Sequence, residues 1–293
     1  MQTQSFLSIA QQFKVVFLDS YGVLKNYKGL IEGVQCTVDA LRSNNIAIRI
    51  LTNDASRSQY QQAESFYALG LHNIEEHEIV TSGMMAKQFL QQKILSGKIA
   101  YLGTENSAHY ILQSGLEHIP VCDVDLKKLD DISAFVFLDD EGFDWNTDIN
   151  KTVNLLRHKN LPVIVANSDK FYPVSKNDVA VATGGLAKLI ENMLNKKFIH
   201  FGKPDSQMFM FAYDLIRDRR PINKKDIVMV GDTLRTDILG GNKFGLDTVL
   251  VLSGNTLPQD ANTRITYRKS YYLFGRIQVN IALAPVLPGL VYL

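Results

Sequence analysis

Short runs of β-branched and other apolar residues alternate with helix-like segments along most of the chain. The runs predict strands at Val15–Leu18, Ile46–Leu51, Ile99–Leu102, Ala134–Leu138, Val163–Ala166, Val179–Ala182, Phe198–Phe201, Ile227–Val230 and Thr248–Leu252. The segments between them predict helices at Thr37–Ser43, Ser58–Leu69, Gly83–Gln92, Glu105–Gln113, Ile149–Lys159, Leu186–Leu194 and Ser206–Arg217. Such alternation is typical of βαβ units, so we expect an α/β protein built on parallel sheets.

Composition narrows the class of protein. The 293 residues exceed the size that one hydrophobic core usually serves, so we expect two domains or an inserted one. The formal net charge of +1 offers no basic field for nucleic acid. No segment reaches the ~20 apolar residues that a membrane-spanning helix needs, so we expect no membrane association.

Cysteine usage and the first residues indicate a compartment. Cys36 and Cys122 lie far apart and lack a C-x-x-C partner, which favours a reducing environment over a disulfide framework. The segment Met1–Ser5 lacks the features of a signal peptide. We therefore predict a cytoplasmic protein.

Polar residues follow four of the predicted strands. They are Asp19, the pair Thr52-Asn53, the pair Gly202-Lys203 and the pair Gly231-Asp232. In open α/β sheets ligands bind outside the carboxyl ends of the strands, so these four ends predict one site assembled from distant parts of the chain. A fifth acidic end, Asp139-Asp140-Glu141, is more simply interpreted as a solvated strand end than as a metal site.

Each segment suits a particular chemistry, and each has a plainer explanation. Asp19 can attack an electrophile, or it can form an ordinary Asx turn. Thr52 and Asn53 can bind a phosphoryl or carboxylate oxygen, or cap the following helix. Lys203 can neutralise carboxylates, or lie in a surface turn. The spacing of Asp232 and Asp237, five residues apart after a buried strand, suits one carboxylate on a metal and another behind it.

In this order and context the four segments resemble the haloacid dehalogenase superfamily, and in particular its class IIA phosphatases. The resemblance covers roughly residues 13–256. It includes the turn Asn53–Ser58, the segment Gly202-Lys203-Pro204 and the segment Asp237–Asn242. Proteins of this branch that are described as predicted sugar phosphatases are the most similar.

The resemblance implies a division of the chain. Residues 1–83 and 197–293 would form a doubly wound parallel-sheet core, and residues 84–196 an inserted α/β cap that selects the substrate. Caps of this type often mediate pairing, which implies a homodimer. The tail, residues 258–293, departs from the family pattern and has no functional interpretation.

The resemblance also implies a phosphatase of a small phosphorylated metabolite. Asp19 would form an aspartyl-phosphate. Mg²⁺ would be held by Asp19, the backbone carbonyl of Tyr21 and Asp232, with Asp237 completing the acidic set.

The remaining roles follow from the same resemblance. Thr52 and Asn53 would bind the transferring group, and Lys203 would add positive charge to the site. In the cap, Asn167 and Asp169 would face the substrate, although ordinary turn chemistry explains them equally well.

Tyr21 departs from the family pattern, since these phosphatases usually carry a second aspartate there that protonates the leaving group. A phenol is a poor substitute for the carboxyl group of an aspartate, because the reference pKa of a phenol is far higher. Three interpretations stay open. One is a phosphatase that is slow or takes good leaving groups, another is a dehalogenase similar to the 2-haloacid enzymes, and the third is a catalytically weak phosphate-binding or regulatory protein.

Overall fold

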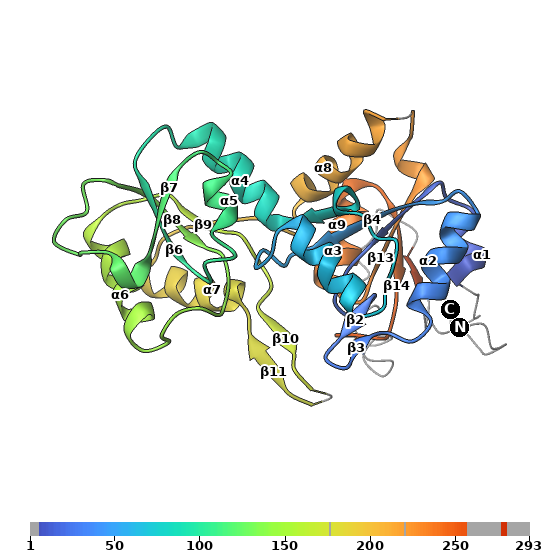
Figure 1. Ribbon diagram of the computed structural model, residues 1–293, viewed down its shortest axis with the longest axis horizontal. Coiled ribbons are helices and arrows are strands. Elements are labelled where there is room, and N and C mark those ends of the chain that lie inside the picture. Colours follow the sequence, from blue (N-terminus) through green and yellow to red (C-terminus); the bar gives the residue numbers. More distant parts are fainter. Residues whose placement is uncertain (1–5, 176, 220, 257–276, 280–293) are drawn as a thin grey trace. The chain divides into compact units, whose positions relative to one another are not determined.

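The computed structural model describes residues 6–256, apart from 176 and 220, and the strand 277–279. The chain forms two compact units, each built on its own main sheet (Figure 1). The first unit comprises Met1–Thr52, Gln59–Val80 and Lys203–Leu293, and the second comprises Asn53–Ser58 and Thr81–Gly202. In sequence, the second unit is therefore inserted into the first.

The first unit contains a six-stranded sheet in the order β15-β14-β13-β1-β4-β5. Its strands are β1 (Val15–Leu18), β4 (Ala47–Thr52), β5 (Ile79–Thr81), β13 (Ile227–Gly231), β14 (Asp247–Leu250) and β15 (Ile277–Val279). The ladders from β4 through β1, β13 and β14 to β15 are parallel. Leu18 is in register with Val230 on one side and Ile50 on the other. The carboxyl ends of the central strands therefore meet at one edge of the sheet.

Strand β1 forms because all four of its residues are apolar and both faces of the sheet are covered. Its four side chains are completely buried or nearly so. Val16 and Leu18 pack into one hydrophobic cluster, and Val15 and Phe17 pack into another on the opposite face. Because β1 is buried on both faces, the position of its last residue, Leu18, is fixed. The position of Asp19, the next residue, is therefore fixed as well.

Helices lie on both faces of this sheet (Figure 1). They are α1 (Phe6–Ala10), α2 (Val34–Ser43), α3 (Gln59–Ala68), α8 (Ser206–Arg217) and α9 (Leu239–Phe244), with the short helical turns η1 (Glu76–Glu78), η3 (Lys224–Asp226) and η4 (Leu234–Ile238). A small hairpin, β2 (Lys25–Asn26) with β3 (Gly29–Leu30), follows β1.

The second unit contains a five-stranded sheet in the order β12-β9-β8-β6-β7, and all its ladders are parallel. The strands are β6 (Lys98–Leu102), β7 (Glu117–Pro120), β8 (Ile132–Phe137), β9 (Val163–Val165) and β12 (Ile199–His200). The helices are α4 (Ser82–Lys93), α5 (His109–Leu112), α6 (Thr147–His158) and α7 (Thr183–Leu194), with the turn η2 (Val121–Asp123). A separate hairpin joins β10 (Phe171–Pro173) to β11 (Val179–Val181).

The predicted α/β class, with parallel sheets and an inserted α/β segment, is confirmed. The prediction was wrong for Val179–Ala182 as a parallel strand, since this segment pairs antiparallel with β10. The connection between the two strands is too short for a parallel crossover, which needs about a dozen residues.

The predicted helix Glu105–Gln113 was also wrong in its first half, because the helix begins only at His109. Ser107 donates its hydroxyl to the carbonyl of Thr104 at 2.6 Å, and Thr104 donates its own hydroxyl to Asp139 at 3.0 Å. These local bonds compete with helical ones and hold the segment as turns.

The tail at residues 258–293 lies outside the described residues except for β15, which extends the sheet beside β14. Among the helices that the structure describes, none is both long enough and apolar enough to cross a membrane.

Candidate active site

Asp19 lies directly after β1 at the carboxyl edge of the six-stranded sheet. Its backbone N–H donates to the carbonyl of Val230 at 2.9 Å, which prolongs the ladder by one residue. Its carboxylate oxygen Oδ1 accepts a hydrogen bond from the backbone N–H of Ser20 at 2.7 Å. The sheet therefore fixes both the backbone and one oxygen of Asp19.

Lys203 lies between two carboxylates. Its Nζ is 2.6 Å from Oδ1 of Asp19 and 2.7 Å from Oδ1 of Asp237, and its side chain is only 2% exposed. The sequence predicted Lys203 at a strand end of the same sheet, but the preceding strand β12 belongs to the second unit. Lys203 instead enters the site from the segment that returns to the first unit.

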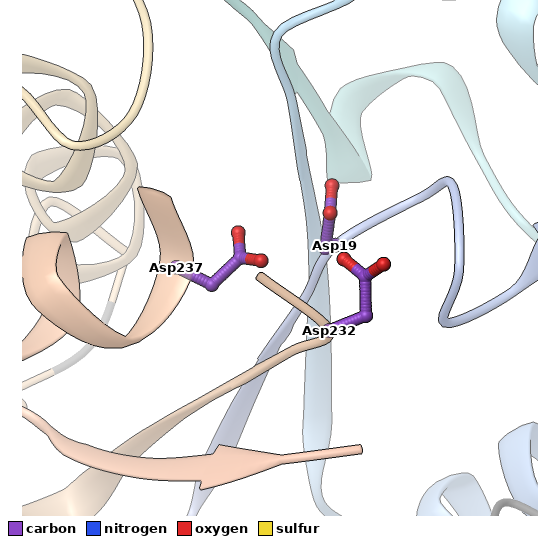
Figure 2. Close-up of side chains that lie close together, drawn as sticks. All are labelled: Asp19, Asp232 and Asp237. Carbon is purple, nitrogen blue, oxygen red and sulfur yellow. The ribbon is translucent and has the colours of Figure 1, made fainter. Parts of the chain in front are cut away.

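Asp232 and Asp237 complete the acidic cluster (Figure 2). Asp232 follows β13, Asp237 lies in the turn η4, and both are fully buried. Oxygen atoms of Asp19, Asp232 and Asp237 all lie within 4.8 Å of one another. Carboxylate oxygens are the ligands that Mg²⁺ prefers, so the chemistry and spacing of this set fit a magnesium ion.

The carboxylates perturb one another. Burial raises the pKa of Asp19 well above its usual range, and Asp237 raises it further while Lys203 opposes both effects. Burial and then Asp237 raise the pKa of Asp232 to about 7. Burial alone would lower the pKa of Lys203, but Asp19 and Asp237 outweigh it and raise that pKa above its ordinary value. Three acids around one ammonium thus form a site that a divalent cation would stabilise.

Tyr21 lies two residues beyond Asp19, and its backbone bridges to Lys25. Burial raises the pKa of its phenol, with smaller increases from Tyr27 and Asp232, and a hydrogen bond from the Tyr27 backbone acts in the opposite direction. A phenol whose pKa lies above its reference of about 10 stays protonated and transfers its proton poorly near neutral pH.

The structure divides the other predicted residues between the units. Thr52 is buried at the end of β4 in the first unit. Asn53, Asn167 and Asp169 belong to the second, where Nδ2 of Asn53 donates to Oδ1 of Asp169 at 2.9 Å. The side chain of Asn167 accepts a hydrogen bond from the backbone N–H of Asp169 at 2.9 Å. The hydrogen bond from Asp169 to Asn167 is ordinary turn chemistry for an asparagine. The roles of Asn53, Asn167 and Asp169 toward a substrate remain predictions.

The sequence interpretation missed the loop after β14, Ser253–Asn255. The backbone N–H of Asn255 donates to Oδ2 of Asp232 at 2.5 Å, and the hydroxyl of Ser253 donates to the carbonyl of Gly22 at 2.5 Å. The signal was present, because Ser253-Gly254-Asn255 is another polar segment after an apolar strand. The rule that found the other strand ends would have included it.

The interpretation of Asp139-Asp140-Glu141 as a solvated strand end was wrong for Asp139, which is 8% exposed. Its carboxylate accepts hydrogen bonds from the hydroxyl of Thr104 at 3.0 Å and the backbone N–H of Asp140 at 2.9 Å. Asp140 in turn accepts from Tyr172 at 3.0 Å and from Thr183 at 3.4 Å. These hydrogen bonds join the end of β8 to neighbouring segments of the second unit.

Comparison with known proteins agrees with this geometry. A protein-family model described as haloacid dehalogenase-like hydrolase matches residues 16–117, and one described as HAD-hydrolase-like matches residues 200–274. The chain is 51% identical to a possible sugar phosphatase of the HAD superfamily from Cytophaga hutchinsonii. That crystal structure has a TM-score of 0.89, and the match covers 95% of this chain and 97% of that one.

Two curated relatives are more distant. Chronophin of Bos taurus is 26% identical over 251 residues, which cover 84% of this chain and 83% of the relative. The chloroplastic phosphoglycolate phosphatase 1A of Arabidopsis thaliana is 26% identical over 268 residues, covering 87% of this chain and 73% of the relative. The similarity therefore extends across both units.

Proposed function

The chain belongs to the haloacid dehalogenase superfamily of hydrolases, and on that basis we propose that it is a magnesium-dependent phosphatase of a small phosphorylated metabolite such as a sugar phosphate. The observation that carries the proposal is the Lys203 ammonium, 2.6 Å from Asp19 and 2.7 Å from Asp237 beside the third carboxylate, Asp232. The similarity to a possible sugar phosphatase and to a phosphoglycolate phosphatase supports the reaction class.

In the first step Asp19 attacks phosphorus. Lys203 and the backbone N–H of Ser20 both bind Oδ1, so Oδ2 is the oxygen that forms the new bond. The bond from phosphorus to the ester oxygen of the substrate breaks, and an aspartyl-phosphate results. Water then attacks phosphorus and regenerates the Asp19 carboxylate with release of phosphate.

Lys203 has two tasks in this scheme. It holds the nucleophile in place, and it balances part of the charge that develops on the phosphoryl oxygens. Asp237 positions Lys203 through the contact at 2.7 Å. Thr52 and Asn53 are proposed to bind the transferring group.

Mg²⁺ would be held by the carboxylates of Asp19 and Asp232 and by the backbone carbonyl of Tyr21, with Asp237 beside them. When bound it would neutralise negative charge and orient the phosphoryl group. The cluster suits this ion because its donors are oxygen atoms and because burial among acids destabilises the ionised carboxylates.

The departing alkoxide needs a proton, and Tyr21 is poorly suited to supply it. General acid catalysis is typically worth about 10²–10⁴-fold, so we propose that turnover is slow unless the leaving group departs unprotonated. This consideration also favours a second candidate function, a catalytically weak phosphate-binding or regulatory protein that keeps the acidic cluster.

We propose that the second unit, Asn53–Ser58 and Thr81–Gly202, contains the substrate-selecting cap. The predicted bounds of that cap are residues 84–196, between core segments 1–83 and 197–293. Asn167 and Asp169 are proposed to contact the substrate, and the cap to mediate a homodimer. We also propose that the protein acts in the cytoplasm.

The test is an assay of p-nitrophenyl phosphate and a panel of sugar phosphates with and without Mg²⁺. Wild type is compared with Asp19→Asn and with Tyr21→Asp, and Asp139→Asn serves as a matched control at a strand end of the second unit. We expect metal-dependent turnover that Asp19→Asn abolishes and Asp139→Asn retains. Tyr21→Asp should raise turnover by about 10²–10⁴-fold where proton transfer limits the rate.

The other outcomes separate the alternatives. An inert wild type with an active Tyr21→Asp variant would favour the binding protein. Chloride release from 2-chloropropionate would favour a dehalogenase, the least supported alternative. Turnover that is independent of metal or survives Asp19→Asn would contradict the proposed phosphatase.

A further inference from the structure

The loop Ser253–Asn255, which follows β14, packs directly on the carboxylate of Asp232. The backbone N–H of Asn255 donates to Oδ2 of Asp232 at 2.5 Å. A Cβ atom added to Gly254 would lie 2.0 Å from the same oxygen, and one added to Gly22 would lie 2.3 Å from it. Two glycines therefore let the chain close around this carboxylate, and a larger residue at either position would displace it.

The other oxygen of Asp232 is bound by the neighbouring residue. The hydroxyl of Thr233 donates to Oδ1 of Asp232 at 3.0 Å. The side-chain amide of Asn255, Nδ2, donates to the same Thr233 hydroxyl oxygen at 3.0 Å. Asn255 thus reaches Asp232 by two routes, one through its backbone and one through Thr233.

The second route has a direction. A hydroxyl group has one proton to donate, and an amide nitrogen can only donate. Because Nδ2 of Asn255 donates to the oxygen of Thr233, the proton of Thr233 is available for Asp232. Without the amide, the hydroxyl would lose one of the two contacts that fix its orientation toward the carboxylate.

Thr233 also links Asp232 to Asp237. Its backbone N–H donates to Oδ2 of Asp237 at 3.0 Å while its side chain binds Asp232. A change in the orientation of Thr233 would therefore affect two of the three carboxylates in the acidic cluster.

We propose that Asn255 is a positioning residue for the magnesium site, which holds Asp232 toward Asp19 and Asp237 by orienting the hydroxyl of Thr233. The proposal rests on the proposed function in that it takes Asp232 as a magnesium ligand. Groups that orient metal ligands typically contribute about 10–100-fold to metal affinity, so the expected effect is measurable.

The experiment measures Mg²⁺ binding to the full-length, metal-free protein by titration calorimetry. Asn255→Ala keeps the backbone N–H and removes the amide, and we expect the Kd for Mg²⁺ to rise about 10-fold. The Tm of the metal-free protein is measured in parallel and should change little. Thr233→Val should weaken binding by a similar factor, and Thr233→Ser, which keeps the hydroxyl, should bind Mg²⁺ as wild type does.

The double variant Asn255→Ala with Thr233→Val tests the route. If Asn255 acts through Thr233, the double variant should bind Mg²⁺ no more weakly than Thr233→Val alone. Asn150→Ala is the matched control, because it removes a side-chain amide of the second unit that donates to the carbonyl of Asn146. We expect its Kd for Mg²⁺ to stay within about twofold of wild type, well below the effect of an orienting group.

Three results would overturn the proposal. Wild-type affinity in Asn255→Ala would show that the amide does not position the site. Additive losses in the double variant would show that Asn255 acts without Thr233. A wild-type protein that binds no Mg²⁺ would remove the premise and so refute the proposed metal dependence as well, which distinguishes it from the first two results. If Asn255→Ala fails to fold, the comparison of Thr233→Val with Thr233→Ser still decides whether the hydroxyl holds the site.

Discussion

The two units each place an aspartate just after a buried strand of a parallel sheet, and the two carboxylates differ in their partners. Asp19 follows β1 and is bound by the ammonium of Lys203, with Asp232 and Asp237 nearby. Asp139 lies two residues after β8 and accepts hydrogen bonds from a hydroxyl and a backbone N–H. The local pattern of apolar strand and aspartate is therefore common to both. The neighbours that the fold supplies decide which one becomes a candidate active site.

Burial raises the pKa of both groups, but the consequences differ. At Asp19 several ionisable groups lie close together, so other carboxylates reinforce the rise and Lys203 opposes it. At Asp139 burial raises the pKa to about 6, and the hydrogen bond from Thr104 opposes it. Concentrated charge suits metal binding and nucleophilic attack, whereas a carboxylate satisfied by neutral donors suits structural support.

The largest expected difference is in turnover. Asp19→Asn removes the proposed nucleophile, and we expect kcat to fall by on the order of 10³-fold or more. Asp139→Asn should leave kcat within about threefold of wild type, because no interaction with the transition state is lost. Both values come from the rate of p-nitrophenyl phosphate hydrolysis, and a comparable loss in the two variants would contradict the comparison.

The next difference is in stability. Lys203→Met leaves Asp19 and Asp237 buried without the cation that they share, and we expect the free energy of unfolding to fall by about 3–5 kcal/mol at pH 7 without Mg²⁺. Thr104→Val removes only a neutral donor from Asp139 and should cost about 1–2 kcal/mol. Urea unfolding measures both changes. A loss in Lys203→Met no larger than that in Thr104→Val would argue against a structural role for the ammonium.

The pH dependence of stability should identify Asp139. Its pKa is about 6 in the folded protein against 3.8 for a free side chain, so the folded state binds the proton more tightly. The resulting stabilisation is complete below pH 3.8 and is lost as the pH rises through 6. Two pKa units correspond to about 3 kcal/mol.

Asp139→Asn cannot titrate, so the wild type should lose about 3 kcal/mol relative to this variant between about pH 3.5 and 7. Trp145 is the single tryptophan of the sequence and lies in the second unit, so its fluorescence during urea unfolding reports on the correct unit. Stability profiles of wild type and variant that run parallel across this range would exclude the shifted pKa.

The smallest expected effect concerns the hydroxyl of Tyr172, which donates to Asp140 at 3.0 Å. Tyr172→Phe removes this one hydrogen bond at a half-buried position and should lower the free energy of unfolding by about 1 kcal/mol. Turnover should stay at the wild-type level. Trp145 fluorescence again measures stability, and a change in kcat without a change in stability would point to a substrate-binding role for this region.

Sequence patterns predicted some elements closely and others poorly. Strand Val15–Leu18 and helix Ser206–Arg217 have the predicted bounds, because continuous burial defines the first and Asp205 caps the second by accepting from the N–H of Gln207. Helix Glu105–Gln113 was predicted too long, since side-chain hydrogen bonds from Thr104 and Ser107 hold its first half in turns. Local propensity does not include such competing partners.

In the candidate site, too, local sequence did not reveal contacts between distant segments. Asp19, Lys203 and Asp232 were identified as candidates because each closely follows an apolar run, and Asp237 because of its spacing of five residues from Asp232. The segment Ser253–Asn255 was missed, although two of its residues bind the acidic cluster or its adjoining turn. Its contact with Asp232 joins segments more than twenty residues apart, and only the neighbouring positions of β13 and β14 bring them together.

By itself the sequence determined which polar residues follow apolar runs and are therefore candidates for an active site, because the pattern of apolar runs fixes where strands stop. The tertiary structure alone decided that Asp19 shares Lys203 with Asp237, that Asp232 is enclosed by Gly22 and Asn255, and that Asp139 accepts hydrogen bonds from a hydroxyl and a backbone N–H. The physical reason is that charge, burial and hydrogen bonding depend on which atoms lie within a few ångströms of one another. Strand order and chain crossings set those distances, and local sequence does not encode them.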